Sequence, residues 1–196
     1  MAAQSNVERR LTPQEYLARE RQAQTKSEYI GGDILAMAGG SPNHSRIASD
    51  ARRSLGNRLA DKPCELFDSD LRVRVRRPGP YYYPDASVVC GEAIFDDEDC
   101  LTNPTVVIEV LSPTTAGYDR GEKWVHYRQM ESLQQYVLIA QNEPLVEHYV
   151  RLESGVWRFE ELRGLDKTLV LLALGCDLPL AEIYRRVRFV VPEQAE

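Results

Sequence analysis

The stretch that decides the fold of this chain is Val106-Val107-Ile108-Glu109-Val110-Leu111. Its apolar and mostly β-branched residues leave no polar face, which is typical of a central strand buried on both sides of a sheet. We predict such a strand over residues 105–111. A carboxylate inside it costs several kcal/mol unless something pairs with it, and burial would raise its pKa. Glu109 is therefore predicted either to belong to a functional site or to lie at a strand end in a salt bridge with an arginine.

A second acid precedes this strand and a lysine follows it. Tyr82-Tyr83-Pro84-Asp85-Ala86-Ser87-Val88-Val89 carries Asp85 in another β-like segment, and Asp119-Arg120-Gly121-Glu122-Lys123-Trp124 carries Lys123 in a helix-like one. Taken singly, each has an ordinary explanation, since Pro-Asp is a common turn pair and a helix lysine is usually solvated. Taken together with Glu109, they predict that two strands and a helix bring their side chains to one site.

Oxygen ligands of this kind suit Mg²⁺, with Mn²⁺ as a substitute ion. Mg²⁺ takes one or two carboxylates, backbone carbonyls and waters, and Asp85, Glu109 and the carbonyl of Val110 can supply the protein ligands. Such an ion acidifies a bound water and neutralises charge on a phosphate, while a lysine such as Lys123 stabilises the charge that develops there. The pattern therefore predicts a Mg²⁺-dependent phosphodiesterase site.

Composition is that of an ordinary globular protein. Of the 196 residues, 43% are hydrophobic and 28% are charged, and a chain of this length buries enough surface to fold without a disulfide or a metal. No apolar run approaches the ~18 residues of a membrane span, and residues 1–10 lack the apolar core of a signal peptide. We expect one domain over residues 1–196, with a core at about 12–140 and a β-rich extension at about 141–187, and a cytoplasmic location.

The cysteines point to no chemistry. Cys64, Cys90, Cys100 and Cys176 form no CxxC pair, and no histidine or asparagine pattern accompanies them. The sequence therefore predicts neither a structural zinc site nor thiol catalysis. Cys90 ends an apolar run and is expected to be a small core residue.

Cap and turn signals divide the chain into helices and strands. Thr12-Pro13-Gln14-Glu15 is a helix start with a capping box, and Gly31-Gly32 between two short runs predicts a hairpin. Ser41-Pro42-Asn43-His44 opens a second helix, in which we interpret His44 as a residue that caps or packs. The pattern indicates one α/β domain with a central mixed sheet. The other predicted elements are strands at 64–77, 81–90, 133–140 and 167–174, two strands within 144–162, helices within 114–130 and 180–187, an acidic loop at 91–103, and a frayed tail from Pro192.

A set of short motifs connects the chain to a known superfamily. They are Glu28-Tyr29-Ile30 with Gly32-Asp33-Ile34, Ser41-Pro42-Asn43-His44, Tyr83-Pro84-Asp85, Asn103-Pro104, Glu109-Val110-Leu111-Ser112-Pro113 and Asp119-Arg120-Gly121-Glu122-Lys123. With them the chain resembles the PD-(D/E)XK nucleases, which share the restriction-endonuclease-like fold, and more closely a widespread bacterial group of that superfamily. The resemblance extends from Thr12 to Tyr184.

The resemblance implies an αβββαβ core and a set of catalytic residues. Asp85 matches the motif aspartate and Glu109 the second acid. The superfamily usually carries its lysine two positions after the second acid, where this chain has Leu111. In the bacterial group the lysine is relocated to the following helix, which matches Lys123. Glu28, on the edge of the first hairpin, could reach the metal through a water or be merely exposed. It resembles an acid that many members carry on an early element, which adds it to the predicted catalytic set.

Three functions are compatible with these residues. The first is a Mg²⁺-dependent DNA endonuclease. The second is a catalytically weak or inactive nuclease-fold protein that acts as an interaction or assembly subunit, which the net charge of −6 and the displaced lysine support. The third is a metal-dependent hydrolase of a small phosphoester. In the first, two groups of arginines are expected to contact the DNA backbone, unless they are ordinary solvated residues. The groups are Arg46, Arg52, Arg53 and Arg58, and Arg72, Arg74, Arg76 and Arg77.

The C-terminal strands predict self-association. Residues 135–174 contain more strands than catalysis needs. We expect Tyr149, Trp157 and Phe159 to form a self-complementary surface, and therefore a homodimer or a larger homo-oligomer.

Overall fold

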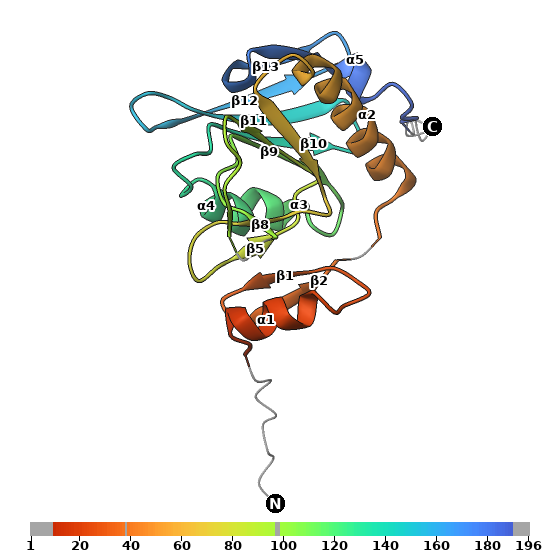
Figure 1. Cartoon of the computed structure of the whole chain (residues 1–196). Helices are drawn as coiled ribbons and strands as arrows, with labels where there is room; N and C mark the ends of the chain where they lie inside the picture. Colours follow the sequence, from red (N-terminus) through yellow and green to blue (C-terminus); the bar gives the residue numbers. More distant parts are fainter. Residues whose placement is uncertain (1–9, 38, 97–98, 190–196) are drawn as a thin grey trace, which may run out of the picture.

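The computed structural model describes residues 10–37, 39–96 and 99–189. Within these ranges the chain forms two six-stranded sheets and one two-stranded sheet, with helices packed against them (Figure 1). Residues 1–9, where no signal peptide is expected, and the tail from Pro192 lie outside the described residues. The central sheet and its helices comprise α2 (Pro42–Leu59), β3 (Cys64–Asp68), β6 (Ala86–Cys90), β9 (Val106–Leu111), α3 (Ala116–Tyr118), a π-helical turn η1 (Asp119–Lys123), α4 (Trp124–Tyr127), β10 (Gln135–Ala140), β11 (Leu145–Arg151) and β12 (Trp157–Arg163).

The second sheet and the C-terminal elements complete the described part of the chain. The second sheet has the strand order β2-β1-β5-β4-β8-β7 and packs with α1. The elements are α1 (Pro13–Glu20), β1 (Ser27–Ile30), β2 (Asp33–Ala36), β4 (Arg72–Arg74), β5 (Tyr81–Tyr82), β7 (Phe95–Asp96), β8 (Cys100–Leu101), β13 (Thr168–Leu171), a 3₁₀ turn η2 (Leu172–Leu174), β14 (Cys176–Pro179) and α5 (Leu180–Ile183).

The central sheet confirms the predicted fold class. Its order is β12-β11-β10-β9-β6-β3, with β9 parallel to β10 and antiparallel to β6. Along the chain, α2, β3, β6, β9, the α3–α4 segment and β10 give the αβββαβ succession that the resemblance implies. The strands β11 and β12 continue the same sheet beyond β10.

The cap signals at the first two helices are confirmed. Thr12 Oγ1 accepts from the amide of Glu15 at 3.2 Å, and Glu15 Oε2 accepts from the amide of Thr12 at 2.8 Å, which is the predicted capping box. Ser41 caps α2 by accepting from the amide of His44 at 3.1 Å. The hairpin β1–β2 turns at Gly31-Gly32, where both residues have positive φ.

The predicted long strands at 64–77 and 81–90 were wrong, because each divides between the two sheets. A turn follows β3, where the amide of Asp70 donates to Asp68 Oδ1 at 2.9 Å, and the chain then enters the second sheet as β4. Pro84 has no amide hydrogen to donate, and it lies between β5 of the second sheet and β6 of the central sheet. The acidic loop contains the short strands β7 and β8, and the strand β14 was not predicted.

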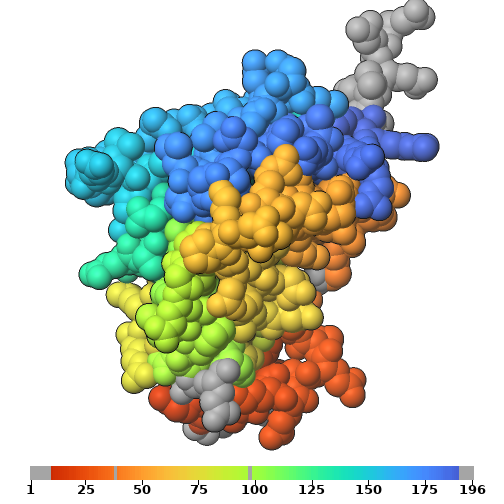
Figure 2. Space-filling model, turned by 45° about the horizontal axis from the view of Figure 1, so that its top comes forward, coloured from red at the N-terminus to blue at the C-terminus, as the bar shows by residue number. Residues whose placement is uncertain are grey.

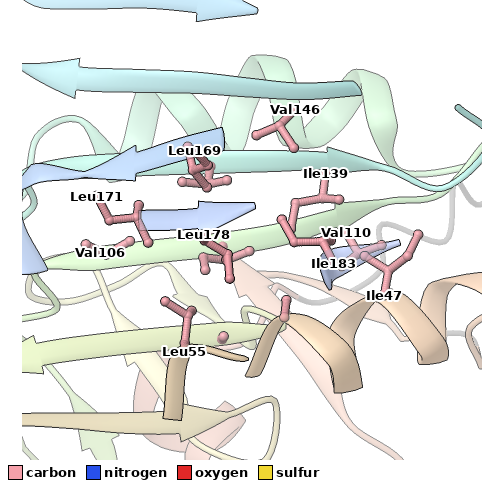
Figure 3. Close-up of a cluster of buried hydrophobic side chains, with 14 of the residues drawn as sticks. Ile47, Leu55, Val106, Val110, Ile139, Val146, Leu169, Leu171, Leu178 and Ile183 are labelled. Atoms are coloured by element: carbon pink, nitrogen blue, oxygen red, sulfur yellow. The ribbon is translucent and has the colours of Figure 1, made fainter. Parts of the chain in front are cut away.

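Two apolar layers cover the two faces of the central sheet. Alternate residues of β9 face opposite ways, so Val106, Ile108 and Val110 join the cluster beneath α2, β13, β14 and α5 (Figure 3). Val107 and Leu111 join the cluster that includes Tyr127 of α4. Figure 2 shows the C-terminal part of the chain (blue) lying against the orange and gold part that contains α2 and β3. Glu109 shares the face of Val107 and Leu111, toward α4.

The strand register changes the interpretation of the cysteines. Cys64 and Cys90 lie directly opposite one another in β3 and β6 and are joined by a disulfide. Cys90 packs against the core beneath α2, as expected, and is partly buried there together with Cys64. The disulfide between the two was not predicted. Cys100 and Cys176 are free.

Two further expectations concern the C-terminal aromatic residues and the absence of a membrane span. The ring centroids of Trp157 and Tyr149 lie 4.8 Å and 4.3 Å from that of Trp124. Part of the surface of these two rings is therefore packed within the chain. Phe159 on β12 remains 49% exposed. Among the helices in the described ranges, none has both the length and the apolar character needed to cross a bilayer.

Candidate active site

Four segments of the chain bring charged side chains to one place between the two sheets. Glu28 comes from β1, Asp85 from the junction of β5 and β6, Glu109 from β9, and Asp119 and Lys123 from η1. Four of the five are buried, with at most 5% of the residue exposed for Glu28, Glu109, Asp119 and Lys123. The side chain of Asp85 is 16% exposed, so the cluster opens toward solvent on its side.

The register of β6 against β9 places Asp85 beside Glu109. Ala86 pairs with Ile108 at the end of this antiparallel ladder, so the next position on each strand is Asp85 and Glu109. The amide of Val110 donates to Asp85 Oδ2 at 2.7 Å and fixes the carboxylate against β9. The two acids quoted from the sequence are therefore neighbours, as the prediction required.

Lys123 lies among three of the buried carboxylates. Its Nζ is 2.8 Å from Glu28 Oε1, 3.2 Å from Glu109 Oε1 and 3.3 Å from Asp119 Oδ1. Burial alone would lower the pKa of Lys123, but the charges of these three acids outweigh burial and raise it. Lys123 is therefore a fixed positive charge that is held from three sides.

The cluster contains more acids than cations. Burial raises the pKa of Glu109 well above its usual range, since Lys123 offsets it only in part and Asp119, Asp85 and Glu28 add repulsion. Burial also raises the pKa of Glu28, against the opposing effects of Lys123 and the amide of Tyr83. A cation bound next to Asp85 and Glu109 would relieve this repulsion.

Asp119 was not among the predicted site residues. It lies four positions before Lys123 on η1, a spacing that places two helical side chains on the same face, and its residue is 2% exposed. Its Oδ1 is close to the ammonium of Lys123 but makes no hydrogen bond of good geometry among the described residues. The sequence signal was present in Asp119-Arg120-Gly121-Glu122-Lys123, but the π-helical turn that aims both side chains inward was not.

His44 has a more specific place than capping or packing. Its Nε2 lies 3.4 Å from Asp85 Oδ2, and its ring faces the carbonyl of Val110. Burial lowers the pKa of His44, but these two acceptors outweigh burial and raise it. The side chain that caps α2 belongs to Ser41 instead. His44 therefore contacts two of the three predicted metal ligands.

The donor set at the open edge fits Mg²⁺ or Mn²⁺. Asp85, Glu109 and the Val110 carbonyl are all hard oxygen donors, and the excess of buried carboxylates calls for positive charge. Across the ranges that the structure describes, no three or more His, Cys, Asp or Glu side chains form a group that could hold a metal ion. The fit therefore rests on two carboxylates and a backbone oxygen, the arrangement in which Mg²⁺ keeps several waters and a substrate phosphate as ligands.

Most of the arginines expected to contact DNA have other partners. Arg72 and Arg74 are only 6% and 8% exposed and pair with Asp99 and Asp96, so the expectation was wrong for both. Arg77 also pairs with Asp96. On α2, partners are found for all four arginines: Arg46 bonds Asn43, Arg52 bonds the Asp85 carbonyl, Arg53 pairs with Asp50, and Arg58 pairs with Glu182.

Comparison with known proteins places this arrangement in a family. An uncharacterized protein of Synechocystis sp. (strain ATCC 27184 / PCC 6803 / Kazusa) is 41% identical over 156 residues, which cover 79% of this chain and 88% of the relative. A second uncharacterized protein of the same organism is 35% identical over 180 residues, covering 92% of this chain and 94% of the relative.

The fold and the family agree. A crystal structure from Anabaena variabilis ATCC 29413, described as a putative nuclease belonging to DUF820, matches with a TM-score of 0.72 and 20% identity. The match covers 89% of this chain and 98% of the chain from Anabaena variabilis. At this level of identity it shows that the two proteins share a fold. Residues 13–181 match the Uma2 family, whose description is "Putative restriction endonuclease". The chain therefore belongs to the Uma2 family, within the restriction-endonuclease-like PD-(D/E)XK superfamily.

Proposed function

We propose that this protein is a Mg²⁺-dependent endonuclease that hydrolyses phosphodiester bonds of DNA. The observation that carries the proposal is the position of Asp85 beside Glu109 at the open edge of a cluster whose lysine is held by three buried carboxylates. The family description supports a nuclease, and a nuclease family implies DNA as the substrate.

The residues divide the chemistry between them. Asp85, Glu109 and the carbonyl of Val110 would hold Mg²⁺, and the bound ion would supply an acidified water and neutralise phosphate charge. Lys123 keeps its proton, so it can donate to a phosphate oxygen as negative charge develops there. The Nζ of Lys123 lies 2.8 Å from Glu28 Oε1, so the ammonium is oriented before the substrate arrives.

Glu28 and Asp119 act through Lys123 in this proposal. Neither is needed as a metal ligand, because both lie against the ammonium. Together with the charge of Glu109, which contributes most, their charges raise the pKa of Lys123 despite its burial and keep it cationic at neutral and alkaline pH. They are positioning residues for the lysine that this chain carries on η1 in place of the usual strand position.

The direct test is relaxation of supercoiled plasmid by the purified protein with Mg²⁺, with Mn²⁺ and with EDTA. We expect cleavage with either metal, none with EDTA, and none in Asp85→Ala or Lys123→Ala. Matched controls are Asp61→Ala and Lys167→Ala, which remove exposed charges outside the cluster and are expected to cleave like the wild type. Cleavage that survives both Asp85→Ala and Lys123→Ala would refute the assigned site.

One observation favours the second candidate, a nuclease-fold protein that binds partners without cutting DNA. Lys123 is 5% exposed and already paired with three acids, so it must exchange a partner to reach a phosphate. Isothermal calorimetry separates the two candidates. No heat of Mn²⁺ binding, together with no plasmid cleavage, is the result expected of the second candidate.

A further inference from the structure

A pocket of about 220 Å³ lies beside His126, whose ring stacks on that of Tyr82. Its walls are the turn between β4 and β5 (Pro78-Gly79-Pro80), the end of β1 (Ile30 and Gly31), and two polar side chains, Arg76 and His126. We call it the Arg76 pocket. Ligand pockets characteristically combine apolar walls with a few convergent polar groups, and this pocket has that composition.

A single tyrosine separates the Arg76 pocket from the catalytic lysine. The Nζ of Lys123 lies 5.5 Å from the centroid of the Tyr82 ring, and the hydroxyl of Tyr82 hydrogen-bonds Nδ1 of His126. The rings of Tyr82 and His126 are stacked with centroids 6.0 Å apart. His126 also lines the pocket, so Tyr82 and His126 connect Lys123 to the pocket wall through direct contacts.

The elements around the pocket are those that build the cluster. Ile30 ends the strand β1 that carries Glu28, and His126 lies on α4, directly after η1. The β4–β5 turn leads through β5 to Asp85. The position of the pocket relative to the cluster is therefore fixed by short, well-paired segments, as a substrate subsite requires.

The charge of the pocket suits an anion. Arg76 is exposed, and no residue in the described ranges forms an ion pair with it, whereas Arg72, Arg74 and Arg77 of the same segment are paired with acids. Burial and the nearby charge of Arg76 lower the pKa of His126, against the effect of Glu122, so the ring is neutral at pH 7. With its Nδ1 engaged by Tyr82, His126 keeps Nε2 for a second hydrogen bond.

We propose that the Arg76 pocket binds the nucleotide next to the scissile phosphate. Arg76 pairs with the phosphate of that nucleotide, and its deoxyribose packs on the Pro78-Gly79-Pro80 turn. Gly79 lets this turn pack directly on the protein's own tyrosines, because a Cβ there would come within 3.2 Å of the ring of Tyr81 and 3.3 Å of the ring of Tyr29. Contacts to phosphate and sugar position DNA without reading bases, so this subsite is indifferent to sequence. The inference rests on the proposed function, since it assumes that the cluster takes DNA.

The test is DNA binding without cleavage. Fluorescence anisotropy with a labelled duplex in EDTA, at several salt concentrations, compares wild type, Arg76→Ala, Arg76→Lys and Arg128→Ala. Arg128 is an exposed arginine just after α4 that does not line the pocket, so its loss matches the change in net charge. We expect Arg76→Ala to weaken binding about tenfold, and to reduce the slope of log affinity against log salt by about 0.9.

The other variants make the result specific. Arg76→Lys keeps the charge and should keep the salt slope, and the loss in Arg76→Ala should be equal for duplexes of unrelated sequence. Thermal unfolding checks that each variant is folded. The same affinity and slope for Arg76→Ala and Arg128→Ala would overturn the inference, as would a wild-type protein that binds no DNA.

If wild-type protein cuts plasmid with Mg²⁺ while Arg76→Ala binds normally, the subsite is wrong and the proposed function stands. If Arg76→Ala binds weakly while the wild type never cuts, Arg76 contacts a DNA phosphate as proposed, and the proposed function fails.

Discussion

The ammonium of Lys123 lies 2.8 Å from the carboxylate of Glu28, although one residue belongs to a π-helical turn and the other to the first hairpin. This contact connects the second sheet to the segment that covers the central sheet. It also explains how a lysine that is absent from position 111 can serve the same site from η1, because Glu28 and Asp119 hold it toward Glu109.

Replacing Lys123 by methionine should destabilise the protein strongly. The change leaves Glu28, Glu109 and Asp119 buried without their shared cation, and removing one partner of a buried ion pair typically costs about 3–5 kcal/mol. Urea unfolding at pH 7.5 measures this loss. The double variant Glu28→Gln/Lys123→Met should regain part of the lost stability but no cleavage. An unchanged unfolding midpoint for Lys123→Met would show that the buried cluster does not depend on this cation.

His44→Ala should weaken divalent-cation binding. The Nε2 of His44 lies 3.4 Å from Asp85 Oδ2 and the ring faces the Val110 carbonyl, so we expect His44 to orient two of the proposed ligands. Loss of such an orienting partner typically costs 10–100-fold in metal affinity. Calorimetry with Mn²⁺ compares His44→Ala with Ser45→Ala, the exposed neighbour on α2. Equal affinities for the two variants would remove His44 from the site.

The ion pair between Glu182 and Arg58 should make stability depend on acid pH. Hydrogen bonds from Arg58 and Ser54 lower the pKa of Glu182 to about 2, from an ordinary value of 4.5. A folded-state pKa below the unfolded one gives stability that is fully present above pH 4.5 and is lost as pH falls toward 2. Because the side chain is 41% exposed, the gain is a surface value of roughly 0.2–1 kcal/mol.

Guanidinium unfolding of wild type and Glu182→Gln across pH 7 to 3 measures this dependence. The wild type should be the more stable protein above about pH 5, and the difference between the two should shrink as the solution is acidified. A difference that stays constant across that range would mean that the ion pair is not its cause.

We also predict a homodimer or a larger homo-oligomer. The strand β12 lies at an edge of the central sheet, and Phe159 on it is 49% exposed. Light scattering at micromolar concentration should give more than the monomer mass, and Phe159→Glu should shift the population toward monomer. Val125→Glu, which changes an exposed apolar residue on α4, is the matched control. A wild-type monomer refutes this prediction.

Local signals gave the parts of the fold that depend on neighbouring residues. The capping box at Thr12, the Gly31-Gly32 turn and the apolar run of β9 each act over a few positions, and each is found in the structure. The division of residues 64–77 between two sheets depends on long-range strand pairing. The alternation of valine and arginine along the chain does not reveal that pairing. The same limit applied to Arg72 and Arg74, whose partners come from the acidic loop.

The sequence indicated that Asp85 and Glu109 come together, but not which residues support them. Glu109 is an acid in an apolar strand and Asp85 directly precedes one, so both stand out without a structure, while their role as metal ligands stays a prediction. The contacts of Asp119 and His44 do not stand out, because one depends on a π-helical turn and the other on how α2 meets the β5–β6 junction. Residues that act through a neighbouring side chain show no unusual pattern of their own.

A crystal structure of the protein grown with Mn²⁺, with anomalous diffraction collected to locate the ion, tests the proposed metal site. We predict a peak in direct contact with a carboxylate oxygen of Asp85, a carboxylate oxygen of Glu109 and the carbonyl oxygen of Val110, at distances close to the ~2.0–2.1 Å of bound Mg²⁺. A well-ordered cluster with no anomalous peak between Asp85 and Glu109 at millimolar Mn²⁺, or an ion bound only elsewhere, would contradict it.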